Sequence, residues 1–331
     1  MDLNIIWFFL VGVLFIGYSI LDGFDLGVGM LQIFTKNEAE KQAALKAIAP
    51  FWDGNEVWLL TGGGALFAAF PHAYGTVFSG FYIAMMLVLV SLILRALSIE
   101  FRNQVESTSW KNVWDKVFTV SSLLVTVLLG VALGNIFVGI PLDGNMNFTG
   151  SFFTLLRPVP LLVGITGMTM MVLQGATYLQ LKSDGTLNQK VGKWAALALK
   201  AFIGMFIILT IAVFLLQKDQ FSTLLSRPAG YLALLLAIIS IVLTHLNLKS
   251  KKHMLAFISS SLVILSMFFI VAATIFPNIV QATNPHFHMT IYSASSSQKT
   301  LGIMLIMALI GMPIVMLYTG IIYRIFRFKK N

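Results

Sequence analysis

The chain has 331 residues, of which 58% are hydrophobic and only 11% are charged. Soluble domains carry about 25% charged residues, so this composition excludes a water-soluble globular protein. The formal net charge of +9 does not indicate nucleic-acid binding, because the basic residues form short clusters between apolar runs rather than one basic patch. The absence of cysteine excludes disulfides, thiolate metal sites and covalent haem attachment.

Long apolar runs recur along the whole chain. A hydrocarbon layer about 30 Å thick needs about 20 helical residues for each crossing. We predict nine transmembrane helices, at residues 4–33, 52–70, 74–101, 113–140, 154–182, 193–217, 228–247, 254–276 and 299–324. The first run lacks a basic flank and is too long for a signal peptide, so we interpret it as a span. The second is the least regular, because Gly62-Gly63-Gly64 would also suit a short or re-entrant segment.

The predicted fold is an all-α integral membrane protein with two four-helix bundles plus one peripheral helix. We expect a single polytopic membrane domain over residues 1–331, with an acid-bearing half at about 1–140 and a second half at about 154–331. No soluble domain or long linker interrupts the apolar runs.

The basic residues indicate the orientation of the chain. Seventeen of the 22 Lys and Arg residues lie in alternate connections and in the C-terminal tail. The other connections and the spans hold only Arg157, Lys200, Lys218, Arg227 and Lys299. By the positive-inside rule, the N-terminus is outside and the C-terminus is cytoplasmic. Termini on opposite sides of the membrane require an odd number of spans, and nine spans meet this requirement.

Three groups of charged and aromatic residues occupy the first three predicted helices. They are Asp22 and Asp25 in the first span, Trp52, Asp53, Glu56 and Trp58 at the start of the second, and Arg95, Glu100 and Arg102 at the end of the third. An ionised acid inside the bilayer costs about 2.5–3.5 kcal/mol unless it faces protein or water, so such acids are usually functional. The structural alternatives are helix caps, interfacial tryptophan anchors and snorkelling arginines.

The predicted topology puts all three groups at the cytoplasmic face. A row of carboxylates reaching inward from the cytoplasm suits proton uptake toward a buried site. His72, His286 and His288 fall in outer connections, and His245 and His253 flank an inner one. No histidine pair faces across the bundle, so we predict no bis-histidine haem in this chain, although a single His or Met ligand stays open. We also predict no catalytic residue and no metal site in this chain.

The same residues carry a family resemblance. The sequence resembles subunit II of the cytochrome bd quinol oxidases at residues 17–29, at 52–71 (WDGNEVWLLTGGGALFAAFP), at 78–82 and at 95–102, with a weaker match in the tail at 313–318. The match is dense over the first hundred residues, and in the second half it lies mainly in the span pattern.

The resemblance implies a catalytic partner in a bacterial cell membrane. That partner, subunit I, would carry haem b, haem d and the quinol site, while the complex oxidises quinol, reduces dioxygen to water and takes protons from the cytoplasm. The family places the acids that match Asp25, Asp53 and Glu100 along or near hydrophilic routes, and the tryptophan that matches Trp58 near a proposed oxygen route. A structural quinone or lipid in this subunit, and a small accessory subunit, stay open.

Two other functions remain in view. A self-sufficient proton-coupled transporter with inverted repeats would need polar groups in both halves, whereas here the intramembrane acids are confined to the first half. A purely structural scaffold would use the same acids only to hold helices together. The leading prediction is an accessory subunit of a respiratory oxidase.

Overall fold

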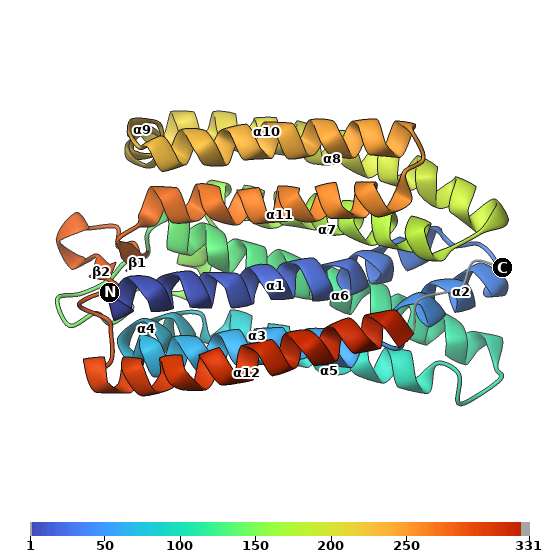
Figure 1. Ribbon diagram of the computed structural model, residues 1–331, viewed down its shortest axis with the longest axis horizontal. Helices are drawn as coiled ribbons and strands as arrows, with labels where there is room; N and C mark the ends of the chain where they lie inside the picture. The colour runs from blue at the N-terminus through green and yellow to red at the C-terminus, as the bar shows by residue number, and fades with distance from the viewer. Residues whose placement is uncertain (1, 326–331) are drawn as a thin grey trace.

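The computed structural model describes residues 2–325, and most of them lie in long helices that run between the two ends of the molecule (Figure 1). The elements are α1 Leu3–Leu31, η1 Gln32–Phe34, α2 Glu38–Ile48, α3 Trp52–Ala69, α4 Pro71–Gly80, α5 Tyr82–Phe101, α6 Thr108–Val138, η2 Phe152–Leu155, α7 Pro158–Lys182, α8 Gly185–Leu216, α9 Lys218–Ser226, α10 Pro228–Lys249, α11 His253–Ile275, β1 Asn278–Val280, η3 Pro285–Phe287, β2 Met289–Thr290 and α12 Gln298–Ile325. The two short strands pair antiparallel and cap one end.

Eight helices in the described part of the chain are long and apolar enough to cross a membrane. They are α1 with η1, α5, α6, α7, α8, α10, α11 and α12. Helix α3 is less apolar because its first turns carry Asp53 and Glu56. Its 18 residues nevertheless rise about 27 Å and connect α2 at one end of the molecule to α4 at the other (Figure 1). The chain over residues 2–325 therefore passes nine times between the two ends, as predicted.

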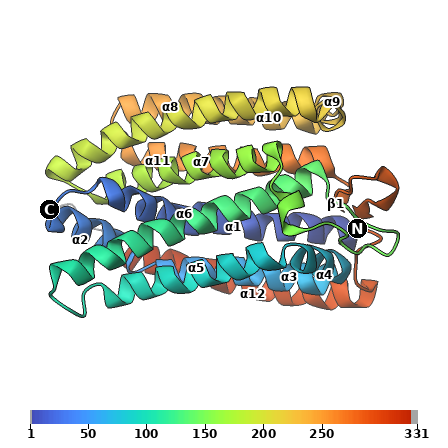
Figure 2. The same cartoon turned by 180° about the vertical axis from the view of Figure 1, so that it is seen from behind.

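The nine long helices form two groups of four and one outlier. Helices α1, α3, α5 and α6 pack together, α7, α8, α10 and α11 form the second group, and α7 joins the groups through α1 and α6. From behind, α6 lies between α5 and α7 (Figure 2). Helix α12 packs mainly on α1 and α3, and only 6% of its most apolar stretch is buried. This arrangement confirms two four-helix bundles plus a peripheral helix.

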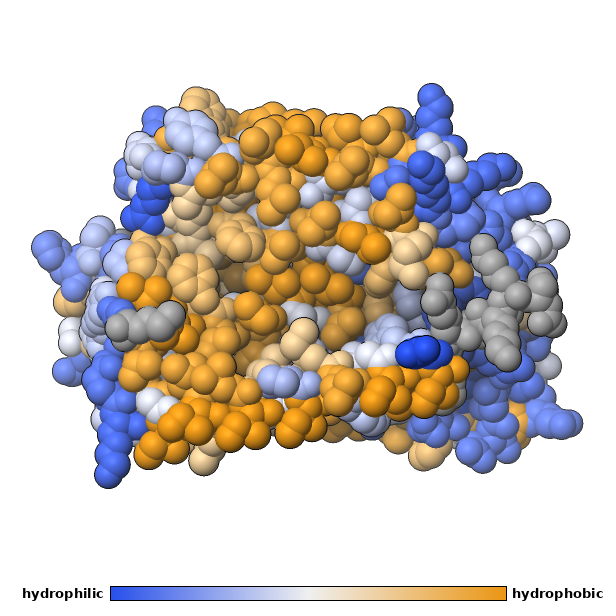
Figure 3. Space-filling model, viewed as in Figure 1, coloured by the Kyte–Doolittle hydropathy of each residue, from blue (hydrophilic) through white to orange (hydrophobic). Residues whose placement is uncertain are grey.

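An apolar belt surrounds the middle of the molecule. In Figure 3, hydrophobic residues cover the centre of the visible face and hydrophilic residues collect at both ends. Large exposed apolar side chains lie on α8, α10 and α12, and include Leu215, Leu232 and Leu309. Surfaces of this kind are stable against lipid or a partner helix rather than against water, so the structure is that of a multi-pass membrane protein.

Three features differ from the sequence-based prediction. The third predicted span is interrupted at Phe81, where φ is −100° and ψ is 19°, so that a short α4 precedes α5. Gly80 lies at this break, and a Cβ there would stand 2.7 Å from the ring of Phe148 in an outer connection. The short helices α2 and α9 were also not predicted, because each has too few residues to cross the layer.

The two bundles meet most closely where α1 crosses α7. A Cβ on Gly27 would lie 2.0 Å from the carbonyl oxygen of Met171, and a Cβ on Gly175 would lie 2.4 Å from the backbone of Gly27. Beside this crossing, the buried amide of Gln174 donates to Ser261 Oγ at 2.9 Å and accepts from Ser260 Oγ at 2.6 Å. This contact fixes the position of α1, which carries two of the predicted acids.

Candidate functional site

A fully buried arginine holds three helices of the first bundle together. Arg95 lies on the inward face of α5 with Ser91 and Ser98, at the helical spacings of four and three residues. Its Nη2 donates to Asp22 Oδ1 on α1 at 2.5 Å and to Glu56 Oε1 on α3 at 2.7 Å. The side chains of Arg95 and Asp22 are 0% exposed, so both charges are withdrawn from solvent and lipid.

The second acid of α1 pairs with an amide. Asn55 Nδ2 on α3 donates to Asp25 Oδ2 at 2.7 Å and, more weakly, to the carbonyl oxygen of Leu21 at 3.2 Å. The hydroxyl of Tyr323 on α12 donates to Asn55 Oδ1 at 3.5 Å, so the peripheral helix also reaches this site. We call Asp22, Asp25, Asn55, Glu56 and Arg95 the acid cluster.

The acid cluster contains more negative than positive groups. It combines the three carboxyl groups of Asp22, Asp25 and Glu56 with the single guanidinium of Arg95. Asp25 is 1% exposed and forms no ion pair within the described residues. Isolated buried charges are costly, so a cluster with surplus carboxyl groups is well suited to exchange protons.

Several polar atoms in this region have no hydrogen-bond partner among the described residues. They are Asp22 Oδ2, Asp25 Oδ1, Arg95 Nε, Arg95 Nη1 and the hydroxyl of Tyr18. Sequence reasoning did not single out Tyr18. The available signal was its position four residues before Asp22 on one apolar helix, which places both on one face.

The other predicted acids lie outside the cluster. Asp53 in the first turn of α3 and Glu100 at the end of α5 are both exposed, and neither makes a side-chain hydrogen bond or ion pair with the described residues. The structure thus joins Asp22, Glu56 and Arg95, and it leaves Asp53 and Glu100 on the outer surface of the bundle.

The two predicted tryptophans have different surroundings. Trp58 is half-buried and packs against α1, where a Cβ on Gly17 would stand 2.4 Å from its ring. Trp52, at the start of α3, is also half-buried. Trp58 therefore determines how closely α3 approaches α1.

A second ionic site lies around α2. Arg102, just after α5, is 1% exposed and makes paired hydrogen bonds with Asp115 on α6 and with Glu38 on α2, between 2.6 and 3.2 Å. Gln32 Nε2 and Lys41 Nζ donate to the same Asp115, at 3.1 and 2.8 Å. We call these five residues the α2 network.

The glutamates of α2 are also held by cations. The hydrogen bond from Arg102 lowers the pKa of Glu38 below its ordinary value of 4.5. In the same first turn, Lys190 of α8 donates to Glu40, and this contact lowers the pKa of Glu40 from the same ordinary value. Helix α2 is therefore attached to both bundles by charge-assisted hydrogen bonds.

Sequence reasoning placed Arg102 with Arg95 and Glu100 and did not find the α2 network. Its residues are far apart in the chain and sit in connections where isolated charges are common. The available signal was Asp115, an acid that stands between the two lysines Lys111 and Lys116.

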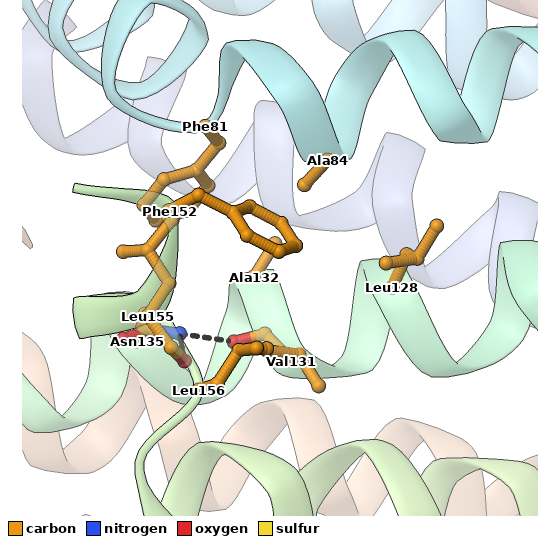
Figure 4. Close-up of a pocket in the computed structure, with 9 residues that line it drawn as sticks. All are labelled: Phe81, Ala84, Leu128, Val131, Ala132, Asn135, Phe152, Leu155 and Leu156. Carbon is orange, nitrogen blue, oxygen red and sulfur yellow. Dashed lines mark hydrogen bonds between the residues drawn. The ribbon is translucent and has the colours of Figure 1, made fainter.

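A small apolar pocket lies between α5, α6 and η2 (Figure 4). It is lined by Phe81, Ala84, Leu128, Val131, Ala132, Asn135, Phe152, Leu155 and Leu156. Asn135 is the polar residue among them, and its Nδ2 donates to the carbonyl oxygens of Leu155 and Val131 while its Oδ1 accepts from Arg157. These bonds engage the amide, so the pocket offers an apolar surface without a polar anchor.

Histidine and acidic side chains are candidate ligands for a metal ion or a haem. Among residues 2–325, no group of three or more His, Asp or Glu side chains is arranged to hold a metal ion. The five histidines lie at helix ends or in connections, and each is exposed or half-buried. None of them is positioned inside the described bundles, where a haem would need an axial ligand.

Comparison with known proteins places this architecture in a family. The family model described as cytochrome bd terminal oxidase subunit II matches residues 3–326. The cytochrome bd-I ubiquinol oxidase subunit 2 of Escherichia coli K12 is 36% identical over 353 aligned positions, which cover 97% of this chain and 93% of that protein. The cytochrome bd ubiquinol oxidase subunit 2 of Bacillus subtilis 168 is 33% identical over 317 positions, which cover 95% and 93%.

A solved structure shares the fold. The bd oxidase of Geobacillus thermodenitrificans has a chain that matches with a TM-score of 0.83 over 100% of both chains, at 16% sequence identity. The family model and both relatives extend over nearly the whole sequence, including the acid cluster and the α2 network. This chain belongs to the cytochrome bd terminal oxidase subunit II family.

Proposed function

We propose that this chain is the subunit of a quinol-oxidising cytochrome bd complex that brings cytoplasmic protons toward the haems of subunit I. The observation that carries the proposal is the acid cluster, which holds three buried or half-buried carboxyl groups and one guanidinium, and in which only Asp22 and Glu56 bind that guanidinium. The named relatives are ubiquinol oxidase subunits, which supports ubiquinol as the electron donor of the complex.

The exposed acids are the proposed entry points. Asp53 lies three residues before Glu56 on α3, so the two side chains are neighbours on one helix face. A proton taken up at Asp53 passes to Glu56 and reaches Asp22 through water beside Arg95, whose guanidinium holds both carboxylates in place and keeps its own protons. Glu100, at the same end of the bundle, is a second entry point. Asp25 on α1, whose carboxyl group accepts a hydrogen bond from Asn55, also receives protons.

The proposed docking surface for subunit I is formed by α3, α5 and α12. These helices lie together along one edge of the molecule in Figures 1 and 2. Helix α12 is the least buried of the spans, and Asp53 and Glu100 are exposed on α3 and α5. Carboxylates facing lipid are unfavourable, so coverage by a partner subunit that offers polar groups explains their placement.

Subunit I is the proposed site of the b and d haems and of the quinol site. The histidines of this chain are exposed or half-buried at the ends of its helices, so they do not provide a pair of axial ligands inside the bundle. Haem supplies the electron-transfer and oxygen chemistry in such a complex. The role left to this chain is to hold and move protons at Asp22, Asp25 and Glu56.

The proposed orientation puts the α2 end in the cytoplasm of a bacterial cell. The basic connections that flank α2 and follow α5, α7 and α10 lie at this end by the alternation of the nine passes. The positive-inside rule then puts the beginning of α1 outside and the end of α12 inside. The acid cluster consequently lies nearer the cytoplasmic end of α1 than its outer end, and we propose the cytoplasm as the source of its protons.

The test uses the complete complex in membranes. In Asp25→Asn and Asp53→Asn complexes we expect quinol oxidation and proton uptake to slow by at least about tenfold, because the loss of one positioned proton carrier costs at least that factor. Haem content, recorded from visible spectra, should stay normal. Asp184→Asn is the matched control, since Asp184 is an exposed acid before α8 and is outside the acid cluster.

The scaffold alternative makes the opposite prediction. If the acids only hold helices together, the neutral variants with normal haem content will turn over and take up protons at the native rate. That result would refute proton conduction through this chain while leaving its place in the complex unchanged.

A further inference from the structure

Tyr18 lies at the inner end of the acid cluster. It is four residues before Asp22 and seven before Asp25 on α1, so all three side chains follow one face of the helix. The span of α1 with η1 covers 32 residues, Leu3–Phe34, and Tyr18 is near its middle. The seven residues from Asp25 to Tyr18 extend about 10 Å along the helix, from the inner half of the layer to its centre.

The hydroxyl of Tyr18 is buried among charges. The residue is 4% exposed, and its hydroxyl lies beside the carboxyl group of Asp22 without a hydrogen bond of normal geometry among the described residues. The charged groups that act on it are those of Asp22, Arg95 and Glu56, which come from three different helices. A tyrosine that only filled space in an apolar core would not direct its one polar atom toward two carboxylates and a guanidinium.

The neighbouring unpartnered atoms are chemically complementary. Arg95 Nε and Nη1 and the Tyr18 hydroxyl can donate hydrogen bonds, while Asp22 Oδ2 can accept them. Buried polar atoms normally have partners, and a water molecule both donates and accepts. A metal cation would fit poorly here, because the guanidinium already occupies the position next to Asp22.

We infer that bound water joins the Tyr18 hydroxyl to Asp22 and Arg95, so that Tyr18 extends the proton path of this subunit to the centre of the membrane. The inference rests on the proposed function. Tyr18 acts as a positioning residue that orders the water, and protons move along the ordered water and the carboxyl groups.

The first experiment removes one oxygen atom. In the Tyr18→Phe complex we expect proton uptake, followed with a pH-sensitive dye in a single turnover, to slow by about tenfold, which corresponds to one lost hydrogen bond to a charged group. Haem spectra should be unchanged, because the ring still fills its place. A native rate of proton uptake would overturn the inference.

The matched control is another buried tyrosine hydroxyl. Tyr178 is 1% exposed, and its hydroxyl donates to the carbonyl oxygen of Ala47 at 2.9 Å. Among the described residues it has no hydrogen bond to the acid cluster, and of that cluster only the charge of Asp25 acts on it. Tyr178→Phe should leave proton uptake unchanged. An equal slowing in both variants would show a general effect of losing a buried hydroxyl and would also overturn the inference.

Two further measurements separate this inference from the proposed function. If the Asp22→Asn and Asp25→Asn complexes take up protons at the native rate, the proposed function fails. If proton uptake is slow in these two complexes but native in the Tyr18→Phe complex, only the role of Tyr18 is refuted. A density map of the complex that resolves water should show a water molecule within hydrogen-bonding distance of the Tyr18 hydroxyl, and clear density for an empty gap there would contradict the inference.

Discussion

Arg95 determines whether the acid cluster can exist inside the membrane. Its Nη2 serves two carboxylates on different helices, and its side chain is completely buried. Breaking such a pair from one side costs about 3–5 kcal/mol, because the remaining charge stays buried without a partner. The third carboxyl group, that of Asp25, has no cation and instead accepts a hydrogen bond from the amide of Asn55. The two acids of α1 thus have distinct environments although they are only three residues apart.

Gly27 is the residue at which substitution should damage the fold most directly. In Gly27→Ala we expect a loss of about 1–3 kcal/mol of stability, since the new methyl group would stand 2.0 Å from the carbonyl oxygen of Met171 and α1 would have to move away from α7. The melting temperature of the purified complex measures the effect.

Gly12→Ala is the control on the same helix. A Cβ at Gly12 has no atom within 4 Å, and alanine is a better helix former than glycine. This variant should be as stable as the native complex or more stable. Equal melting temperatures for the two variants would contradict the close contact between α1 and α7.

At the scale of elements, α2 is a short helix whose position depends on charge. It has eleven residues, too few to span the layer, and its Glu38 and Glu40 bind Arg102 and Lys190 from opposite sides. The pKa of each glutamate is lowered by these hydrogen bonds. Their stabilising contribution is therefore complete above the ordinary pKa of 4.5 and is lost as the pH falls through the lowered value in the folded state.

Acid should release α2. We expect the melting temperature of the complex to be steady from neutral pH down to about pH 5 and to fall below pH 4.5, with a smaller fall in Glu38→Gln. At neutral pH this variant should lose at most about 1 kcal/mol, because Glu38 is half exposed and solvent weakens the pair. Melting curves across the pH range provide the measurement. Glu106→Gln, an exposed acid in the next connection, should follow the native curve.

At the scale of the whole molecule, the distribution of basic residues predicts the orientation in the membrane. The chain contains no cysteine, so single-cysteine variants report cleanly. In intact cells, a membrane-impermeant maleimide should label Asn145→Cys in the connection between α6 and α7, and should not label Glu106→Cys between α5 and α6. Both sites are exposed, and both should react after the membrane is opened. Labelling of Glu106→Cys but not of Asn145→Cys in intact cells would contradict the proposed topology.

The spans were predictable because each depends on a local property. A run of about 20 apolar residues between polar breakers can be read without knowing its neighbours. The predicted 113–140 and 254–276 accordingly correspond to α6 Thr108–Val138 and α11 His253–Ile275. The interruption at Phe81 was not predictable in this way, because it depends on Phe148 in a distant connection packing against Gly80.

The sequence alone determined the membrane class, the nine passes and the identity of the acids, since hydropathy and charge are sums over neighbouring residues. Only the tertiary structure decided which acids meet. Arg95 and Asp22 are 73 residues apart, and their contact exists because three helices pack at one place, while Glu100, five residues after Arg95, points away from the bundle. The same packing brought Tyr18 next to the acid cluster, and its spacing of four residues from Asp22 shows a shared helix face but not that Arg95 and Glu56 meet it there.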